Sequence, residues 1–399
     1  MGIAATAALL AVPAGASALT YPVTNTADSG GGSLRDAMTT ANGTTADDVI
    51  DITATGTISP TSAALPAIPA VATGGKLTIQ GPGASALTVS RNFAATGSVF
   101  SVQANANASI SGMTITNGTA SGVFNSGTLS LDAVEISGNS TASGGGGIHN
   151  GSSPAVPATL TVDRSAIVGN TTTGAAGAGG IYDNQSSTVT VLRSTISQNT
   201  VSTISAGGGA AVFGSATFTA STIAGNTSAA GSAPFATGTG ANLFVQSTTA
   251  TLNQTLVADA LSSTATAPTN CQTFGGTISS LGYNLADDSS CSLSAGTDLP
   301  VADPALGPLT GPAPRYKPFA ASSPAADKIP AASCATSADQ RNVARPQGAL
   351  CDVGAFEFQA AASPTPTTPS PAPKKKCKKP KKKGKSAAAA KKCKKKRKK

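Results

Sequence analysis

A pattern of about ten residues recurs through the middle of the chain and limits the folds open to it. Each copy alternates apolar and polar residues and then carries Ile three positions before Asn; the clear copies are 129–139, 160–170, 189–199 and 216–226. Weaker copies lie at 108–118 and 250–260. The equivalent apolar positions, 110, 131, 162, 191, 218 and 252, are separated by 21, 31, 29, 27 and 34 residues. A parallel β-helix tolerates such irregular spacing, because insertions fall in its turns while its strands stay in register.

A shorter apolar segment precedes each copy and predicts a second strand in every coil, at 122–125, 146–150, 179–184, 209–214 and 240–245. We therefore expect an all-β chain, a single-stranded parallel β-helix whose coils stack about 4.8 Å apart. Only 11% of the residues are charged and 4% aromatic, with 44 Gly. So few large side chains suit a solenoid, in which each coil buries only a thin slice against its neighbours.

Stacking the copies places equivalent residues in columns. One predicted core column contains Ile136, Ile167, Ile196 and Ile223. A second contains Asn139, Asn170, Asn199 and Asn226. Asn tolerates the left-handed conformation of a tight turn, and stacked amides hydrogen-bond along a column. We interpret this Asn ladder as structural and assign it no catalysis.

A third column consists of rings that follow the apolar residue of each short strand: Phe124, His149, Tyr182, Phe213 and Phe244. Alternation puts them on the face opposite Val123, Ile148, Ile181, Val212 and Leu243. On the outside, five stacked rings would bind flat sugar faces or an apolar partner; on the inside, they would fill the core. The packing interpretation is favoured. His149, the only His, is then one more ring and not a base.

Charged residues offer one catalytic candidate, Asp163 and Arg164, with Asp132 and Arg193 in the equivalent columns. In polysaccharide lyases of this fold, stacked carboxylates and arginines bind calcium and an acidic sugar. Two Asp are few ligands for Ca²⁺, so we favour an exposed strand solubilised by compensating charges. The acid cluster of a polygalacturonase-type hydrolase and the nucleophile elbow of a Ser-His-Asp triad are missing from the sequence. We therefore assign no catalytic residue, metal or cofactor, with calcium expected only for a lyase.

The first 18 residues predict a signal peptide that ends at Ala16, Ser17 and Ala18, a small-x-small cleavage pattern. The first basic residue is Arg35, so the positive n-region is missing and we expect the true start upstream of Met1. No other apolar run approaches transmembrane length. The chain is therefore expected to be secreted, extracellular or associated with the cell surface.

Behind the signal, we expect an N-terminal cap with the first coils at 19–107, the repeats at 108–307 and a C-terminal capping region at 308–358. A helix at 33–42, with Ser33 as N-cap and Asp36 at its third position, is predicted to cover the first coil, because an open β-helix exposes unpaired strand edges. Residues 359–373 contain five Pro, which predicts a stiff, extended linker.

The C-terminal tail, residues 374–399, contains 17 of the 27 Lys and Arg and no acidic residue. The rest of the chain carries 10 basic and 18 acidic residues. We expect the tail to be disordered and, after export, to bind anionic partners such as wall polymers, lipid headgroups or extracellular nucleic acid, with no specific nucleic-acid site. The alternative is a tail that only solubilises the protein.

The six Cys fit an exported protein. Neighbouring pairs in two loop-like regions predict the disulfides Cys271–Cys291 and Cys334–Cys351. In the tail, Cys377 and Cys393 would pair with each other or crosslink chains. No Cys and His spacing indicates zinc.

Both ends of the chain resemble a known family. The segments TNTADSGGGSLRDAMTTAN (24–42), DDVIDI (47–52), LPAI (65–68) and LTIQGPG (77–83) resemble the N-terminal region of secreted bacterial β-helix proteins with a GSLR-A-x-x-x-AN signature. The segments SLGYNLADDSSC (280–291), SSPAADKIP (322–330) and DQRNVARPQGALCDVGAFEF (339–358) resemble the C-terminal part of choice-of-anchor Q domain proteins.

This resemblance spans roughly residues 20–358 and implies a pectate-lyase-like, right-handed parallel β-helix exported to the cell surface or medium. It implies no catalytic residues. Two departures stand out: Asn342 replaces the usual Gly after DQR, and GPAPRYKPF replaces a glycine-rich stretch before Ser322.

Two functional hypotheses follow. The leading one is a non-enzymatic surface protein, namely a stalk, an adhesin or a glycan-binding protein, held to anionic envelope polymers by its tail. The rival is a polysaccharide lyase or glycoside hydrolase acting on an acidic glycan, which depends on analogy of fold.

Overall fold

Three parallel sheets form the walls of the structure, a computed structural model that describes residues 17–70, 75–174, 177–202, 207–229, 240–263 and 267–359. Most of the predicted signal peptide, the linker beyond residue 359 and the tail with Cys377 and Cys393 lie outside these ranges. Sheet A has ten strands: β1 (Thr20–Val23), β2 (Asp48–Ile52), β4 (Lys76–Gln80), β7 (Asn107–Ser111), β10 (Thr128–Asp132), β15 (Thr159–Asp163), β20 (Thr188–Leu192), β24 (Ser215–Thr219), β28 (Thr249–Asn253) and β32 (Thr277–Ser280).

Sheet B has nine strands: β3 (Gly56–Ile58), β5 (Leu87–Ser90), β8 (Thr114–Thr116), β11 (Glu135–Ser137), β16 (Ala166–Val168), β21 (Thr195–Ser197), β25 (Thr222–Ala224), β29 (Leu256–Ala258) and β33 (Leu285–Ala286). Sheet C has seven: β6 (Phe100–Val102), β9 (Val123–Asn125), β14 (Ile148–Asn150), β19 (Ile181–Asp183), β23 (Ala210–Val212), β27 (Leu243–Gln246) and β31 (Cys271–Phe274).

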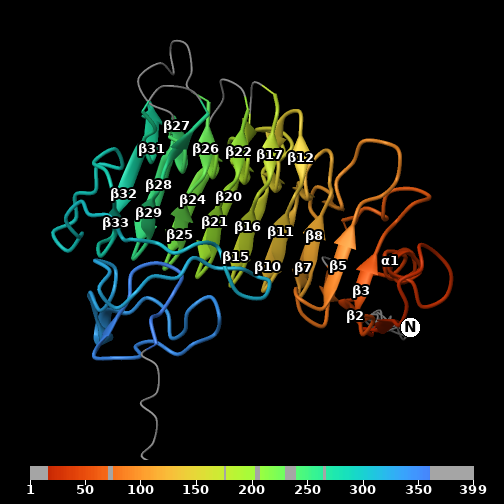
Figure 1. Cartoon of the computed structure of the whole chain (residues 1–399). Helices are drawn as coiled ribbons and strands as arrows, with labels where there is room; N and C mark the ends of the chain where they lie inside the picture. Colours follow the sequence, from red (N-terminus) through yellow and green to blue (C-terminus); the bar gives the residue numbers. More distant parts are fainter. Residues whose placement is uncertain are drawn as a thin grey trace, which may run out of the picture. The chain divides into compact units, whose positions relative to one another are not determined.

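Two smaller parallel sheets lie between sheets B and C along the chain. One contains β12 (Ser140–Thr141), β17 (Thr171–Thr172), β22 (Thr200–Val201), β26 (Thr227–Ser228) and β30 (Leu261–Ser262), and the other β13 (Gly144–Gly145) and β18 (Gly177–Ala178). Each full coil thus contributes one strand to each of sheets A, B and C in turn, and Figure 1 shows the equivalent strands of successive coils side by side. The all-β parallel β-helix that the repeats predicted is confirmed.

Burial follows the period of the strands. In β10, Leu129 and Leu131 face the core while Ser130 and Asp132 face outward. In sheet B, the predicted column is confirmed, since Ile136, Ile167, Ile196 and Ile223 are paired one to the next and are 0% exposed.

The turn after sheet B differs from the prediction in one respect. We expected the Asn of each ladder position to adopt the left-handed conformation, but the residue before it does so: Gly138 (φ 64°), Gly169 (65°), Gln198 (58°) and Gly225 (67°). Gly adopts this conformation without strain, which leaves the Asn free to turn its amide inward.

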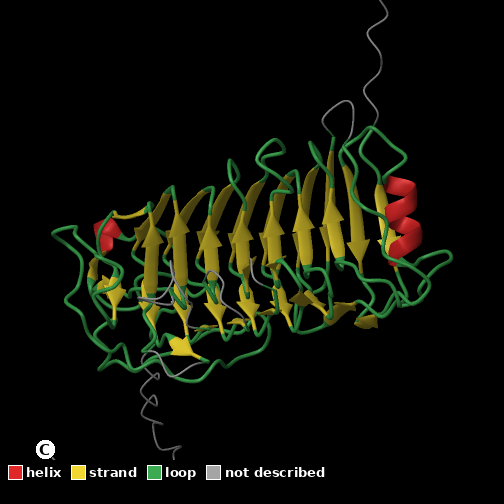
Figure 2. Cartoon of the chain, turned by 90° about the horizontal axis from the view of Figure 1, so that it is seen from above, coloured by secondary structure: helices red, strands yellow, loops and turns green. Residues whose placement is uncertain are grey.

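The first coil is covered by α1 (Leu34–Ala41), shown beside the end of the strands in Figure 2. Ser33 caps the helix, because its side chain accepts a hydrogen bond from the amide of Asp36. Leu34 and Met38 are buried in the main core.

The other end is closed by a segment that we assigned to the repeats. Residues 287–302, which we call the end segment, follow β33, the last strand of sheet B. Leu293 of this segment packs against the main core. The amides of Leu299 and Ala302 donate to the carbonyls of Asn284 and Ala286.

The region 308–358, which we expected to cap this end, lies instead along the side of sheet B; we call it the flank region. It is coloured blue in Figure 1. It contains the antiparallel pair β34 (Ile329–Pro330) and β35 (Leu350–Cys351) and the short helix η1 (Ala331–Ser333). Phe319, Ile329 and Val353 pack on Leu256 and Leu285 of sheet B in a second core.

Candidate functional site

The amides of the Asn ladder hydrogen-bond from coil to coil. Nδ2 of Asn139 donates to Oδ1 of Asn170 (2.9 Å), and the same bond joins Asn170 to Asn199 (3.0 Å) and Asn199 to Asn226 (2.9 Å). The ladder then continues beyond the sequence repeat through Asn242 and Asn270 and ends on the carboxylate of Asp287. Every ladder Asn is at most 1% exposed, so these amides contact no solvent.

A second polar column lies inside sheet C and was missed in the sequence. Nδ2 of Asn125 donates to Oδ1 of Asn150, and Nδ2 of Asn150 donates to Oδ1 of Asp183, both over 2.8 Å. Asp183 is 0% exposed, and its Oδ2 makes no hydrogen bond within the described part of the chain. Burial raises the pKa of Asp183 to about 7.

The ring column lies on the outer face of sheet C. Ring centroids are 4.9 Å apart between Phe124 and His149, 5.1 Å between His149 and Tyr182, 5.1 Å between Tyr182 and Phe213, and 6.0 Å between Phe213 and Phe244. One member is out of register: Ala211 of β23 pairs with Tyr182 and Phe244, and Phe213 follows two residues later. The ring of Phe213 fills the space that the small side chain of Ala211 leaves.

This column is neither a free platform nor part of the main core. Phe244 is buried together with Ala178 of β18 and Ala211, and Tyr182 and Phe213 pack against this small cluster while remaining half-buried. Gly144 of β13 lies against His149, since a Cβ at Gly144 would come within 2.1 Å of the imidazole Nδ1. Burial lowers the pKa of His149, and its enclosed Nε2 makes no hydrogen bond to any residue that the structure describes. The imidazole is thus held neutral among rings.

The charged candidates form ion pairs between coils. Arg164 binds Asp132 of the preceding coil through Nε (2.9 Å to Oδ1) and Nη2. Arg193 binds Asp163 in the same way, with Nε 2.9 Å from Oδ1. Both arginines have left-handed backbones, with φ of 45° and 43°, at the turn between sheets A and B. The bond to Asp132 raises the pKa of Arg164.

The described residues contain no group of three or more His, Cys, Asp and Glu side chains that could hold a metal ion. The same part of the chain contains no helix long and apolar enough to span a membrane.

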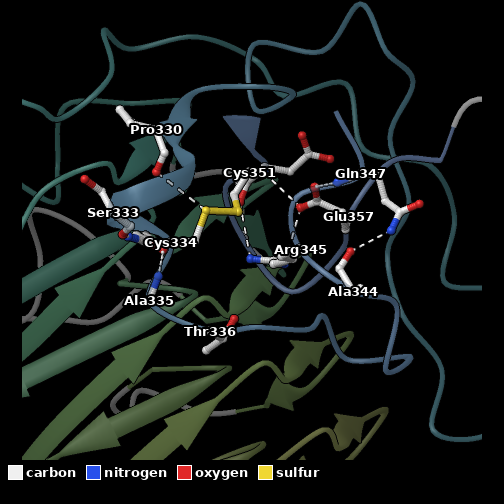
Figure 3. Close-up of a disulfide and its surroundings, with 12 residues drawn as sticks. Pro330, Ser333, Cys334, Ala335, Thr336, Ala344, Arg345, Gln347, Cys351 and Glu357 are labelled. Atoms are coloured by element: carbon white, nitrogen blue, oxygen red, sulfur yellow. Dashed lines mark hydrogen bonds and ion pairs between the residues drawn. A yellow bond between two sulfur atoms is a disulfide. The ribbon is translucent and has the colours of Figure 1, made fainter. Parts of the chain in front are cut away.

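Both expected disulfides are present. Cys271 and Cys291 join the last strand of sheet C to the end segment, with Cα atoms 4.9 Å apart. Cys334, which directly follows η1, is joined to Cys351 of β35, with Cα atoms 6.1 Å apart. Figure 3 shows the second disulfide beside the buried ion pair of Arg345 and Glu357, in which Nε lies 3.3 Å from Oε2.

The flank region is bonded to several coils of the solenoid. Arg315 binds the buried carboxylate of Glu135 in β11 through its backbone amide (3.0 Å), Nε (3.0 Å) and Nη2 (2.7 Å). Oγ1 of Thr195 in β21 donates to Oε1 of Gln340 (2.6 Å). The backbone amide of Ala355 donates to Oγ1 of Thr222 in β25 (3.0 Å).

A cleft of about 350 Å³ opens between the flank region and the turn of the solenoid that holds Arg164; we call it the flank cleft. Its lining includes Ala133 and Arg164 from the solenoid and Pro314, Tyr316, Arg341 and Asn342 from the flank region. Sequence reasoning had no means of finding this cleft, because its two walls come from segments about 150 residues apart with no shared pattern.

Comparison with known proteins assigns this chain to no family. No family model matches the chain, and no curated protein matches it. A solved structure that resembles it is that of the pectate lyase Pel9A, which is 14% identical over 86% of this chain and 96% of that chain, with a TM-score of 0.40.

Proposed function

We propose that this chain is an exported, non-enzymatic β-helix protein of the cell surface, belonging to the choice-of-anchor Q group that its end segments resemble. The observation that supports this most is the pairing of its catalytic candidates with one another. A general base must give up its proton near the working pH, and Arg164 holds its proton more tightly because Asp132 binds it. Asp132 and Asp163 each accept two bonds from an arginine, so these four residues join coils together.

The tail supplies the proposed attachment. Seventeen Lys and Arg within 26 residues repel one another unless anions compensate them. We propose that residues 374–399 hold the solenoid to anionic polymers of the envelope, while the two disulfides stabilise it in an oxidising compartment.

The first experiment tests the absence of catalysis. The full chain is incubated with a panel of anionic polysaccharides, and new reducing ends and unsaturated products are measured. We expect none. Depolymerisation that disappears in Asp163→Asn would refute the proposal and establish the lyase or hydrolase instead.

The second experiment tests the anchor. Cells that express the full chain, a chain lacking residues 374–399, or a chain whose tail Lys are replaced by Gln are fractionated at low and at 1 M salt. We expect only the full chain to stay attached at low salt and to be released at 1 M, where the Debye length is about 3 Å. Attachment of the truncated chain would refute electrostatic anchoring, and release by a reducing agent alone would indicate crosslinking through Cys377 and Cys393.

A further inference from the structure

The walls of the flank cleft are held in place from both sides. On the solenoid side, Arg164 is oriented by its two bonds to Asp132. On the flank side, Nε2 of Gln340 donates to the carbonyl of Arg315 (2.8 Å), while its Oε1 accepts from Thr195 of the solenoid. A ligand would therefore meet a largely preformed site, as small-molecule sites usually are.

The charged groups of this cleft have one sign. Arg164 and Arg341 are the charged residues of its lining, and their partners Asp132 and Asp339 lie outside that lining. Each arginine uses Nε and Nη2 to bind its aspartate. The Nη1 donor of each guanidinium is left without a hydrogen bond to another described residue, and two such donors at one cleft favour an anion.

The remaining lining suits a sugar ring. Pro314 and Ala133 offer apolar carbons, and Tyr316 is fixed by stacking on Phe356, with centroids 5.5 Å apart and planes 12° apart. The Tyr316 hydroxyl and the side-chain amide of the exposed Asn342 make no hydrogen bond to other described residues. Sugars combine apolar C–H faces with hydroxyl groups that need such polar partners. A volume of about 350 Å³ is at the small end of ligand sites, which suits one sugar residue.

We propose that the flank cleft binds a single anionic sugar residue, with its acidic group at Nη1 of Arg164 and Arg341 and its ring against Pro314 and Tyr316. This site uses no residue of the tail, so it does not depend on the anchoring function proposed above. The acidic group is a carboxylate or a sulfate, and the experiment distinguishes the two by comparing a sugar carboxylate with a sugar sulfate.

Titration calorimetry on the full chain at physiological salt tests the site, with methyl glucuronide, glucose 6-sulfate, methyl glucoside and acetate as probes. We expect one acidic sugar to bind at one site with a Kd of about 1 mM, as is usual for a ligand of this size. The proposal would be overturned if methyl glucoside or acetate bound saturably and as tightly as the acidic sugars do. It would also be overturned if neither acidic sugar bound saturably.

Variants locate the site. Arg164→Gln is expected to weaken binding about tenfold or more, because it removes a charge-assisted hydrogen bond. Asn342→Asp is expected to weaken it similarly by placing a carboxylate in the cleft. Arg193→Gln is the matched control, because Arg193 makes the same ion pair one coil further along with the same backbone conformation but does not line the cleft.

The pattern of the three variants decides the outcome. Loss in Arg164→Gln and Asn342→Asp with retention in Arg193→Gln supports the cleft. Equal loss in Arg164→Gln and Arg193→Gln, or unchanged binding in Asn342→Asp, would overturn it.

Discussion

The side-chain amide of Asn199 donates a hydrogen bond of 2.9 Å to the amide oxygen of Asn226, one coil further along. Nδ2 of Asn199 also donates to the carbonyl of Ile167 (2.8 Å), while Oδ1 accepts from the backbone and side-chain amides of Asn170 (both 3.0 Å). One buried side chain thus satisfies polar groups of two neighbouring coils. Because such groups are costly to bury unpaired, the ladder fixes the register between coils.

Replacing Asn199 with Ala should therefore destabilise the solenoid by about 3 kcal/mol, since it leaves buried donors and acceptors unpaired and opens a cavity. The urea midpoint of unfolding measures this. Thr190→Ala, at an outward position of β20, is the control and should shift the midpoint little. Equal shifts in the two variants would mean that the ladder contributes nothing beyond an ordinary strand residue.

The column that ends at Asp183 predicts a dependence of stability on pH. The folded pKa of Asp183 is raised from 3.8 to about 7, so between these values the folded state binds more protons than the unfolded state. The contribution of Asp183 to the free energy of unfolding therefore falls as the pH rises from about 4 and levels off above 7, by roughly 4 kcal/mol in total.

Asp183→Asn removes this titration and continues the amide column of Asn125 and Asn150. The free energy of unfolding of the variant, relative to that of the original chain, should rise as the pH increases from 5 to 8. Urea unfolding at each pH measures this difference. A difference that is constant over this interval would show that Asp183 is not protonated in the fold.

Much of the architecture was predictable because the chain repeats. Ile136 and Asn139 recur at equivalent positions of four copies, and the parallel stacking of copies leaves one arrangement for such columns. Ser33 and Asp36 likewise determine the start of α1 from local chemistry.

Three features escaped prediction for physical reasons. Ala211 occupies the strand position that pairs with Tyr182, and Phe213 lies two residues later. The sequence pattern shows only that each short strand is accompanied by a ring, so it does not reveal this shift in register. Asp183 replaces an Asn in a column only three coils long, too short to be noticed as a pattern. The flank region has no repeat, so its position depends on individual tertiary contacts such as that of Arg315 with Glu135.

The flank region should be a separate unit of local stability, and its disulfide tests this. Cys334 and Cys351 close a loop with a sequence separation of 17, for which loop closure contributes about 3 kcal/mol. Replacing both with Ser should expose residues 308–358 to limited proteolysis while the solenoid stays resistant. The matched control replaces Cys271 and Cys291 with Ser and should loosen the end segment instead. Identical cleavage maps for the two variants would show that the flank region does not unfold independently of the solenoid.

The last prediction concerns the ion pair of Arg345 and Glu357 in the flank region. Both side chains are 1% exposed, and Glu357 also accepts bonds from the amides of Gln347 (2.9 Å) and Asp352 (3.0 Å). Burial raises the pKa of Glu357, so its charge depends on the guanidinium beside it. Arg345→Met should destabilise the flank region by about 3–5 kcal/mol, since it leaves a buried carboxylate without a counter-charge.

Two companion variants separate this effect from ordinary loss of an ion pair. Arg193→Gln removes an ion pair at the solenoid surface, where such pairs contribute less than about 1 kcal/mol. The double variant Arg345→Met with Glu357→Gln removes both buried charges and should recover part of the stability lost in Arg345→Met. Limited proteolysis of the flank region and the urea midpoint are measured for all three. The prediction is wrong if the double variant is less stable than Arg345→Met alone. In that case the hydrogen bonds that Glu357 accepts from Gln347 and Asp352 stabilise the flank region more than the unpaired charge of Glu357 destabilises it.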